Sequence, residues 1–244
     1  MKNNWLVYAQ FAEGSVIPPS SVFDVKNAAV AVLPKPTTVK TYQAGSVWKH
    51  NRVTLDLDAY YSHFQNPYAT TPDPTTGEPV YYLTGPSNTQ GIEAESNVAV
   101  GWGVGLYLND TLGSAKYATT GLWVASAPRD TETVGVTYQY RNWDLGLFDK
   151  HIGKMYNDNG SINEAVKIDP FSITNAFINT VKGSSYLRGS KIRFSINNLL
   201  DRHSIVGVNP ASTASNAPAP GDVLTLLPAR SFMITITPAY ATKP

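Results

Sequence analysis

The feature that most constrains the fold of this chain is an alternation of apolar and polar residues over long segments. Val53, Leu55, Leu57, Ala59 and Tyr61 are apolar or aromatic, whereas the residues between them are mostly polar. Side chains of a β-strand point alternately to its two faces, so this period of two predicts a strand with one apolar and one polar face. The chain is therefore expected to be all-β.

The same alternation recurs along the chain and predicts about ten strands in all. Clear instances lie near 52–62, 89–100, 102–109, 130–140, 191–196 and 231–237. Weaker instances, in which the alternation slips by one residue, lie near 4–12, 38–49, 143–156 and 170–182. A slip of one residue predicts a β-bulge.

Short and long links alternate between these segments. The short links are at 49–51, 101, 141–142 and 183–189, and the long ones are at 13–37, 66–87, 112–129, 157–169 and 199–226. This pattern is typical of an antiparallel up-and-down transmembrane β-barrel, whose short turns lie on the periplasmic side. The longest segments also approach the ~9–11 residues of a bilayer-spanning strand, whereas strands of a soluble β-sandwich usually have ~5–6.

The tryptophans agree with a membrane barrel. Trp48, Trp102 and Trp143 each lie close to a short link, and Trp5 begins a strand that would rise from the same end. Amphipathic aromatic rings gather at membrane interfaces. We therefore expect these four tryptophans to form an aromatic girdle at one height.

Composition and motifs exclude several other functions. The chain has 19 Lys+Arg against 18 Asp+Glu, a formal charge of +1, which argues against nucleic acid as a partner. Its four histidines are scattered and it has no cysteine, so we expect no metal site, no cofactor and no enzyme activity. The longest apolar run, 28–33, is too short for a transmembrane helix. The N-terminus lacks a signal-peptide stretch, so the protein either stays inside the cell or its front is missing.

Two segments near the C-terminus carry a distinctive pattern. Residues 192–202 read IRFSINNLLDR, and residues 228–236 read PARSFMITI. Asn197 and Asn198 are expected to end a strand where water begins. Asp201 and Arg202 can pair beside the rim. Pro228 presets the extended start of the last strand without needing a backbone donor.

These segments resemble the closing strands of TonB-dependent outer-membrane receptors. In that family the penultimate strand ends in N-L-[FL]-D-[RK], and the final strand opens with P-[GA]-R. Residues 38–45 (TVKTYQAG), 91–95 (GIEAE) and 128–129 (PR) are similar to further motifs of the family, in the family's order. The matched signature positions in this chain are Asn198, Leu199, Asp201, Arg202, Pro228 and Arg230.

The resemblance implies an outer-membrane protein for energy-coupled uptake of a scarce ligand, most often a ferric siderophore. Such a receptor has about 22 strands and a plugged lumen, so residues 1–244 would form an open C-terminal part of the barrel without the plug. Its implied partners are outer-membrane lipid, the ligand, the TonB energy-coupling protein through the plug, and the barrel-assembly machinery.

Aromatic residues in the long links are the candidate ligand contacts. Their flat faces and polar tips suit catecholate or aryl chelates and equally sugars, or they form only an upper aromatic girdle. These residues are Tyr68, Tyr81, Tyr82, Tyr117 and Trp123. A small passive porin and a soluble β-rich carbohydrate-binding module are the alternative functions.

Two structural expectations separate these alternatives. First, one set of apolar side chains should face lipid and should not lie in a sealed core between two sheets: Val53, Leu55, Leu57, Val104, Leu106, Ile192, Phe194, Phe232, Ile234 and Ile236. Second, the polar face is rich in glycine, serine and threonine, which would fill a narrow lumen poorly. We therefore expect an open sheet whose first strand, near 4–12, does not pair with the last, near 230–238.

Overall fold

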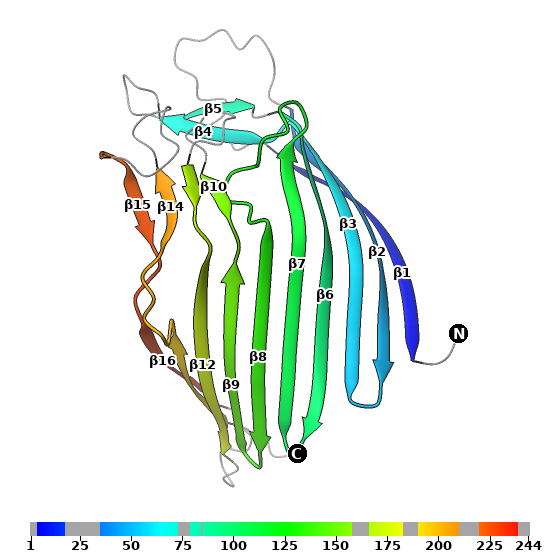
Figure 1. Ribbon diagram of the computed structural model, residues 1–244, viewed down its shortest axis with the longest axis vertical. Coiled ribbons are helices and arrows are strands. Elements are labelled where there is room, and N and C mark those ends of the chain that lie inside the picture. Colours follow the sequence, from blue (N-terminus) through cyan, green and yellow to red (C-terminus); the bar gives the residue numbers. More distant parts are fainter. Residues whose placement is uncertain are drawn as a thin grey trace.

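One antiparallel sheet of ten strands dominates the computed structural model, which describes residues 4–17, 35–72, 79–83, 85–157, 166–182, 190–209 and 220–238. Neighbouring strands follow one another in the sequence, apart from three inserted hairpins (Figure 1). The ten strands are β1 (Trp5–Val16), β2 (Thr37–His50), β3 (Val53–Gln65), β6 (Ser87–Gly101), β7 (Val104–Tyr117), β8 (Asp130–Tyr140), β9 (Trp143–Ile152), β12 (Phe171–Lys182), β13 (Ser190–Asn197) and β16 (Ser231–Thr237). The expected all-β, up-and-down architecture is confirmed.

The two ends of the sheet differ as expected. Links of two residues join β2 to β3, β6 to β7 and β8 to β9 at what we call the short-turn end, the lower end in Figure 1. In the β6–β7 turn, Gly103 has φ +85°, and a Cβ there would overlap the carbonyl group of Gln139, so the turn requires glycine. No helix among the described residues is long and apolar enough to cross a membrane.

Three small hairpins occupy the long links, which the alternation did not predict. They lie at the opposite end of the sheet, here called the long-loop end (Figure 1). The pairs are β4 (Tyr68–Pro72) with β5 (Pro79–Leu83), β10 (Met155–Asn157) with β11 (Val166–Ile168), and β14 (Ile205–Asn209) with β15 (Val223–Leu226).

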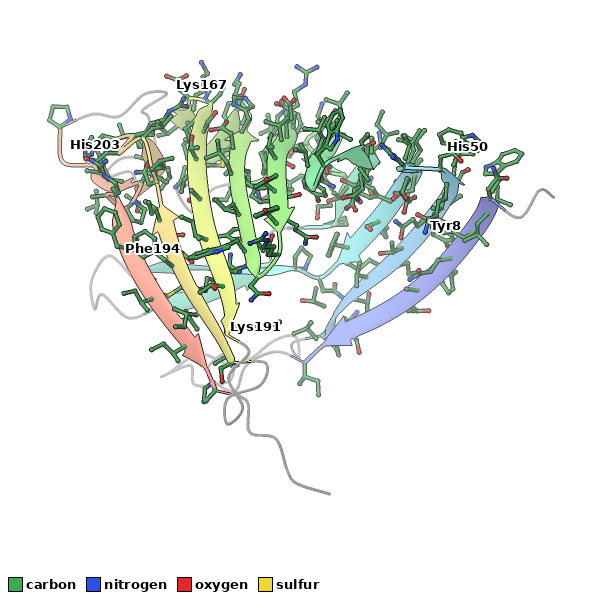
Figure 2. The ribbon with its side chains drawn as sticks, turned by 90° about the horizontal axis from the view of Figure 1, so that it is seen from below. Tyr8, His50, Lys167, Lys191, Phe194 and His203 are labelled. Atoms are coloured by element: carbon green, nitrogen blue, oxygen red, sulfur yellow. The ribbon has the colours of Figure 1, made fainter. Side chains whose placement is uncertain are left out.

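The sheet is open. β1 pairs only with β2 and β16 only with β13 among the described residues, so the two edge strands do not meet. Figure 2, drawn from the short-turn end, shows β1 and β16 at opposite margins of one curved sheet. The expectation that the first and last strands do not pair is confirmed.

The two faces of the sheet differ in polarity and exposure. In β3 the side chains of Leu57 and Tyr61 are exposed, whereas Asp56, Asp58 and Tyr60 on the other face are partly buried. Polar side chains that crowd together while apolar ones spread apart indicate that the polar face is concave and the apolar face convex. This arrangement is the reverse of a soluble protein, in which the apolar face is covered.

The apolar residues expected to face lipid lie on the convex face, and none of the ten is buried. Exposed fractions reach 48% for Leu57 and 68% for Ile234. A soluble sandwich would seal such residues between two sheets, and no second large sheet occurs among the described residues. The soluble alternative therefore does not match the fold.

On most strands the convex apolar stretch starts at the short-turn end and stops at a polar residue. It runs from Trp5 to Phe11 on β1 and from Val53 to Tyr61 on β3, and it is followed there by Glu13 and His63. The stretch on β3 is close to the ~9–11 residues that a tilted strand needs to cross the hydrocarbon core. The convex face thus carries a band suited to lipid contact.

Aromatic residues mark the upper edge of this band. Phe11, Tyr42 and Tyr61 stand directly opposite one another on β1, β2 and β3, just below the polar residues Glu13 and Lys40. The rings of Phe11 and Tyr42 are 5.1 Å apart between centroids. From the sequence, an upper aromatic girdle was expected only from loop residues, and this row of strand aromatics was missed. The row becomes visible only when the registers of the three strands are known.

The expected bulges at the weaker strands are wrong. β1 with β2, β8 with β9, and β9 with β12 each pair in a continuous register. The alternation slips because apolar side chains also occur on the concave face, as with Leu6 opposite Val47 and with Phe148. Within the described strands of the large sheet, the one register shift lies between Ala99 and Gly101.

A compact apolar cluster lies at the long-loop end. Val166, Ile168 and Val208 are at most 2% exposed and pack with three other buried residues, Met155, Phe171 and Leu227. These residues come from β10, β11, β12, β14 and the segment before β16. The cluster therefore ties the two C-terminal hairpins to the upper end of the wall.

Candidate ligand-binding surfaces

The expected ligand-contacting aromatics come from three segments at the long-loop end. Tyr68 is on β4, and Tyr81 and Tyr82 are on β5. The two strands pair with each other, and Tyr68 stands opposite Leu83. Tyr117, at the end of β7, is only 5% exposed. Its ring offers no open face to a ligand, so the expectation that a loop presents Tyr117 does not match the structure.

Trp123 is placed against the end of β7. Its backbone forms a β-bridge with Lys116, and the Lys116 Nζ lies 5.7 Å from the centroid of the indole ring. The loop after β7 folds back to make this contact, since the amide of Val124 donates to the carbonyl of Ala115 at 3.0 Å. Trp123 and Lys116 thus form a cation–π pair at the long-loop end.

This pair borders a hollow of about 700 Å³, which we call the long-loop hollow. Gly91 and Gly113 stand opposite each other on β6 and β7, and a Cβ at either position would approach the Tyr60 hydroxyl to about 3 Å. The wall therefore has a stretch without side chains, ringed by hydroxyl, cationic and aromatic groups. Its lining includes Tyr60, Gly91, Gly113, Lys116, Trp123 and Arg129.

The four expected girdle tryptophans all lie at the short-turn end. Trp5 is opposite Trp48 in the β1–β2 register, and its Nε1 donates to Ser46 Oγ at 2.5 Å. Trp102 is 94% exposed in the β6–β7 turn, and Trp143 begins β9 opposite Tyr140. Their contact with a membrane interface stays a prediction.

The concave face has an acidic side. Asp56 and Asp58 of β3 stand opposite Glu95 and Glu93 of β6. The Tyr8 hydroxyl reaches over β2 and lies 3.4 Å from Asp56 Oδ1 and 3.4 Å from Asp58 Oδ2. No cluster of three or more residues able to hold a metal ion occurs in the described part of the chain.

The other side of the concave face is aromatic. The rings of Tyr107 and Phe148 are 6.1 Å apart, and those of Phe148 and Phe177 are 6.2 Å apart and nearly parallel. The Arg193 guanidinium lies 4.2 Å from the Phe177 ring centroid. Phe148 lies over Gly135, where a Cβ would overlap its ring. This row, which crosses β7, β9, β12 and β13, was not identified from the sequence.

The C-terminal signature residues form a hydrogen-bonded clamp around Asn198, which is 1% exposed. Asn198 Nδ2 donates to the carbonyls of Arg202 and Pro228, both at 2.9 Å, and its Oδ1 accepts from the Arg202 amide at 2.9 Å. The Asn198 amide in turn donates to Asn175 Oδ1 at 3.0 Å. Asn198 is therefore a buried connector, which corrects the expectation that it ends a strand in water.

Asp201 pairs with Arg230, which corrects the expected pairing with Arg202. The amide of Arg230 donates to Asp201 Oδ1 at 2.8 Å, and its guanidinium lies 3.6 Å from Oδ2. Arg230 also donates to the carbonyl of Leu199 at 3.4 Å. Asn198, Asp201, Pro228 and Arg230, here called the closing clamp, therefore fix the start of β16 against the end of β13.

The clamp lowers the pKa of Asp201 below its usual 3.8. The hydrogen bond from the Arg230 backbone amide is the main cause; desolvation opposes it, and the charges of Arg230 and His203 reinforce it. A carboxylate with a lowered folded pKa stabilises the fold above its unfolded pKa, and this contribution is lost as the pH falls through the folded value.

We therefore expect Asp201→Asn to reduce stability at neutral pH and to matter little in acid. The difference between the two proteins should stay constant above about pH 5 and shrink below about pH 4. Urea midpoints of the micelle-refolded proteins at pH 7 and pH 3 measure it. Glu13→Gln is the control, because Glu13 pairs with Lys40 at 3.7 Å on the exposed rim. An equal difference at both pH values would contradict the role given to the carboxylate.

Comparison with known proteins supplies a family and several similar structures. Residues 1–199 match the family model described as TonB dependent receptor-like, beta-barrel. No curated protein matches the sequence.

Three solved structures illustrate the similarity of fold. The ferric-catecholate import receptor Fiu from Escherichia coli K12 is 17% identical with a TM-score of 0.63, over 97% of this chain and 33% of that one. The ferric yersiniabactin uptake receptor FyuA from Yersinia pestis is 17% identical with a TM-score of 0.65, over 97% and 35%. The copper transporter OprC is 12% identical with a TM-score of 0.72, over 97% and 37%. The chain therefore spans about a third of the length of these proteins.

Proposed function

Because the chain belongs to the TonB-dependent receptor-like β-barrel family, whose members lie in the outer membrane, we propose that it serves energy-coupled uptake of a scarce ligand. The family consists of receptors and transporters and not of enzymes. In this proposal the chain supplies barrel wall and long loops. A plug domain outside these 244 residues contacts the TonB energy-coupling protein, and the barrel-assembly machinery inserts the barrel.

A ferric siderophore is the ligand class that we propose. The observation that carries this choice is the long-loop hollow, whose lining includes the cations Lys116 and Arg129 together with Trp123 and Tyr60, with Lys116 beside the Trp123 ring. Ferric catecholates and related aryl chelates are anionic and have flat faces, so cations and aromatic rings suit them. The names of two similar structures, a ferric-catecholate and a ferric yersiniabactin receptor, agree with this class.

Tyr68, Tyr81 and Tyr82 are proposed as further contacts from the β4–β5 hairpin. They lie at the same end of the sheet as the long-loop hollow. A passive porin, the alternative function, needs a closed wall, and among the described residues β1 and β16 do not pair with each other, which does not support it.

Uptake by intact cells tests the proposal. Cells that carry the protein should accumulate a radiolabelled ferric catecholate, and dissipation of the proton-motive force should stop it. Reversing both charges, with Lys116→Glu and Arg129→Glu, should lower uptake more than tenfold, because the anion then meets two like charges. Arg141→Gln, in a short turn at the other end, is the matched control. Uptake that persists without energy would instead identify a passive porin.

A further inference from the structure

A second hollow lies on the concave face at the short-turn end, about 570 Å³ in volume. We call it the short-turn hollow. It is bordered by the β2–β3 turn and by the lower parts of β6, β7, β8 and β9, so it is separate from the long-loop hollow. Figure 2 is drawn from this end, with His50 marking the β2–β3 turn. Its volume is in the range of small-molecule sites.

The border of this hollow is cationic. Lys49 and Arg52 both line it, and its lining includes no carboxylate in the part of the chain that the structure describes. Arg52 is held in place because its Nη1 donates to the carbonyl of Val100 at 2.9 Å. Glu95 of β6 accepts hydrogen bonds from two lining residues, from the Tyr107 hydroxyl at 3.3 Å and from Asn97 Nδ2 at 3.2 Å. The hollow therefore presents two positive charges to whatever enters it.

The floor of the hollow is partly aromatic. Tyr107 and Phe148 form part of the lining, together with Gly105 and Thr137. The Phe148 ring covers Gly135, where a Cβ would overlap it, and the aromatic row continues to Phe177 and the Arg193 guanidinium. Rings laid over glycines expose a broad face, which is a surface for stacking a flat group.

We propose that the short-turn hollow is a second ligand site, which takes a flat anionic group such as an aryl carboxylate or catecholate near the exit of the lumen. The charge of Lys49 and Arg52 holds the anion, and the Phe148 ring stacks against the flat group, with Tyr107 at its edge. The identification of this anion with the transported ligand as it leaves the lumen rests on the proposed function. The site itself rests only on the chemistry of its lining.

Binding of 2,3-dihydroxybenzoate to the purified protein in detergent micelles tests the site. Ligand-observed NMR titration should show saturable binding, and uncharged catechol should bind at least fivefold more weakly. Lys49→Gln with Arg52→Gln should weaken binding of 2,3-dihydroxybenzoate about tenfold, as should Phe148→Leu. Arg52→Lys keeps the charge and should retain most of the affinity.

Arg141→Gln is the matched control, because Arg141 is also a cation of a short turn but lies 5.1 Å from the Tyr140 ring on the convex face. It should leave binding unchanged. Near-ultraviolet circular dichroism identifies any variant that fails to fold. If the glutamine variants fail to fold, the affinity of Arg52→Lys, which keeps the charge, decides whether the site binds the anion. Absence of saturable binding, or binding that responds to Arg129→Gln and not to the Lys49 and Arg52 changes, would overturn the proposal.

The outcome is independent of the uptake experiment. If energy-coupled uptake fails but binding at Lys49 and Arg52 is retained, the site exists but the anion it binds is not a transported ligand. If uptake occurs but the probe does not bind at Lys49 and Arg52, the proposed function holds and the second site is wrong.

Discussion

Replacing Asn198 with alanine is expected to lower the free energy of unfolding by about 3 kcal/mol. The Asn198 side chain is almost fully buried and makes three hydrogen bonds, two to the Arg202 backbone and one to the Pro228 carbonyl. Its loss leaves two backbone carbonyls and one backbone amide, all partly shielded from water, without these partners; a fully buried group left unpaired costs about 1–3 kcal/mol, so three partly buried groups together account for the expected loss. Denaturant unfolding in micelles, followed by tryptophan fluorescence, measures the change.

The neighbouring Asn197 provides the control. Its side chain is exposed and donates one hydrogen bond to Ser231 Oγ at 3.3 Å. Asn197→Ala should therefore change the free energy of unfolding by less than about 0.5 kcal/mol. Equal losses for the two variants would mean that Asn198 acts only as a strand terminator and that the closing clamp does not carry the stability assigned to it.

Leu106→Arg is expected to cost about 2–4 kcal/mol of stability in a bilayer. Leu106 is 44% exposed on the convex face and stands between Val98 and Val136 in the middle of the apolar band. An arginine there would place its guanidinium in hydrocarbon, where neither water nor a carboxylate can reach it. Unfolding titrations in phospholipid vesicles measure the loss.

Asn109→Arg is the matched control on the same strand. Asn109 lies on the concave face between Glu95 and Thr133, so the new cation would meet water and a carboxylate. Its effect should stay within about 0.5 kcal/mol. If the two arginines cost the same, the convex face does not meet lipid.

The large sheet was predictable because each strand repeats one local rule. Along β3, every second residue from Val53 to Tyr61 is apolar, and the whole wall follows from repeating that pattern with alternate short and long links. The rule failed where the concave face also carries apolar residues. Leu6 opposite Val47 and Phe148 over Gly135 place apolar residues at concave positions, so the sequence pattern imitates a bulge where none exists.

The sites were less predictable because they depend on contacts between distant residues. Asp201 has Arg202 beside it in the sequence, but the start of β16 brings Arg230 to its carboxylate. Tyr117 has the residue type expected of a ligand contact, and only its burial shows that its ring is not free to meet one. The two hollows combine side chains from several strands and turns, so only strand register reveals them.

The central claim is that the convex face meets lipid and the concave face meets water. The chain contains no cysteine, so single cysteines at positions 104 to 109 of β7 can each carry a nitroxide label without background. Collision rates with oxygen and with a water-soluble nickel chelate should alternate along the protein in vesicles. We expect oxygen to dominate at 104, 106 and 108, and the nickel chelate at 105, 107 and 109. Equal access of both reagents at all six positions would contradict the claim.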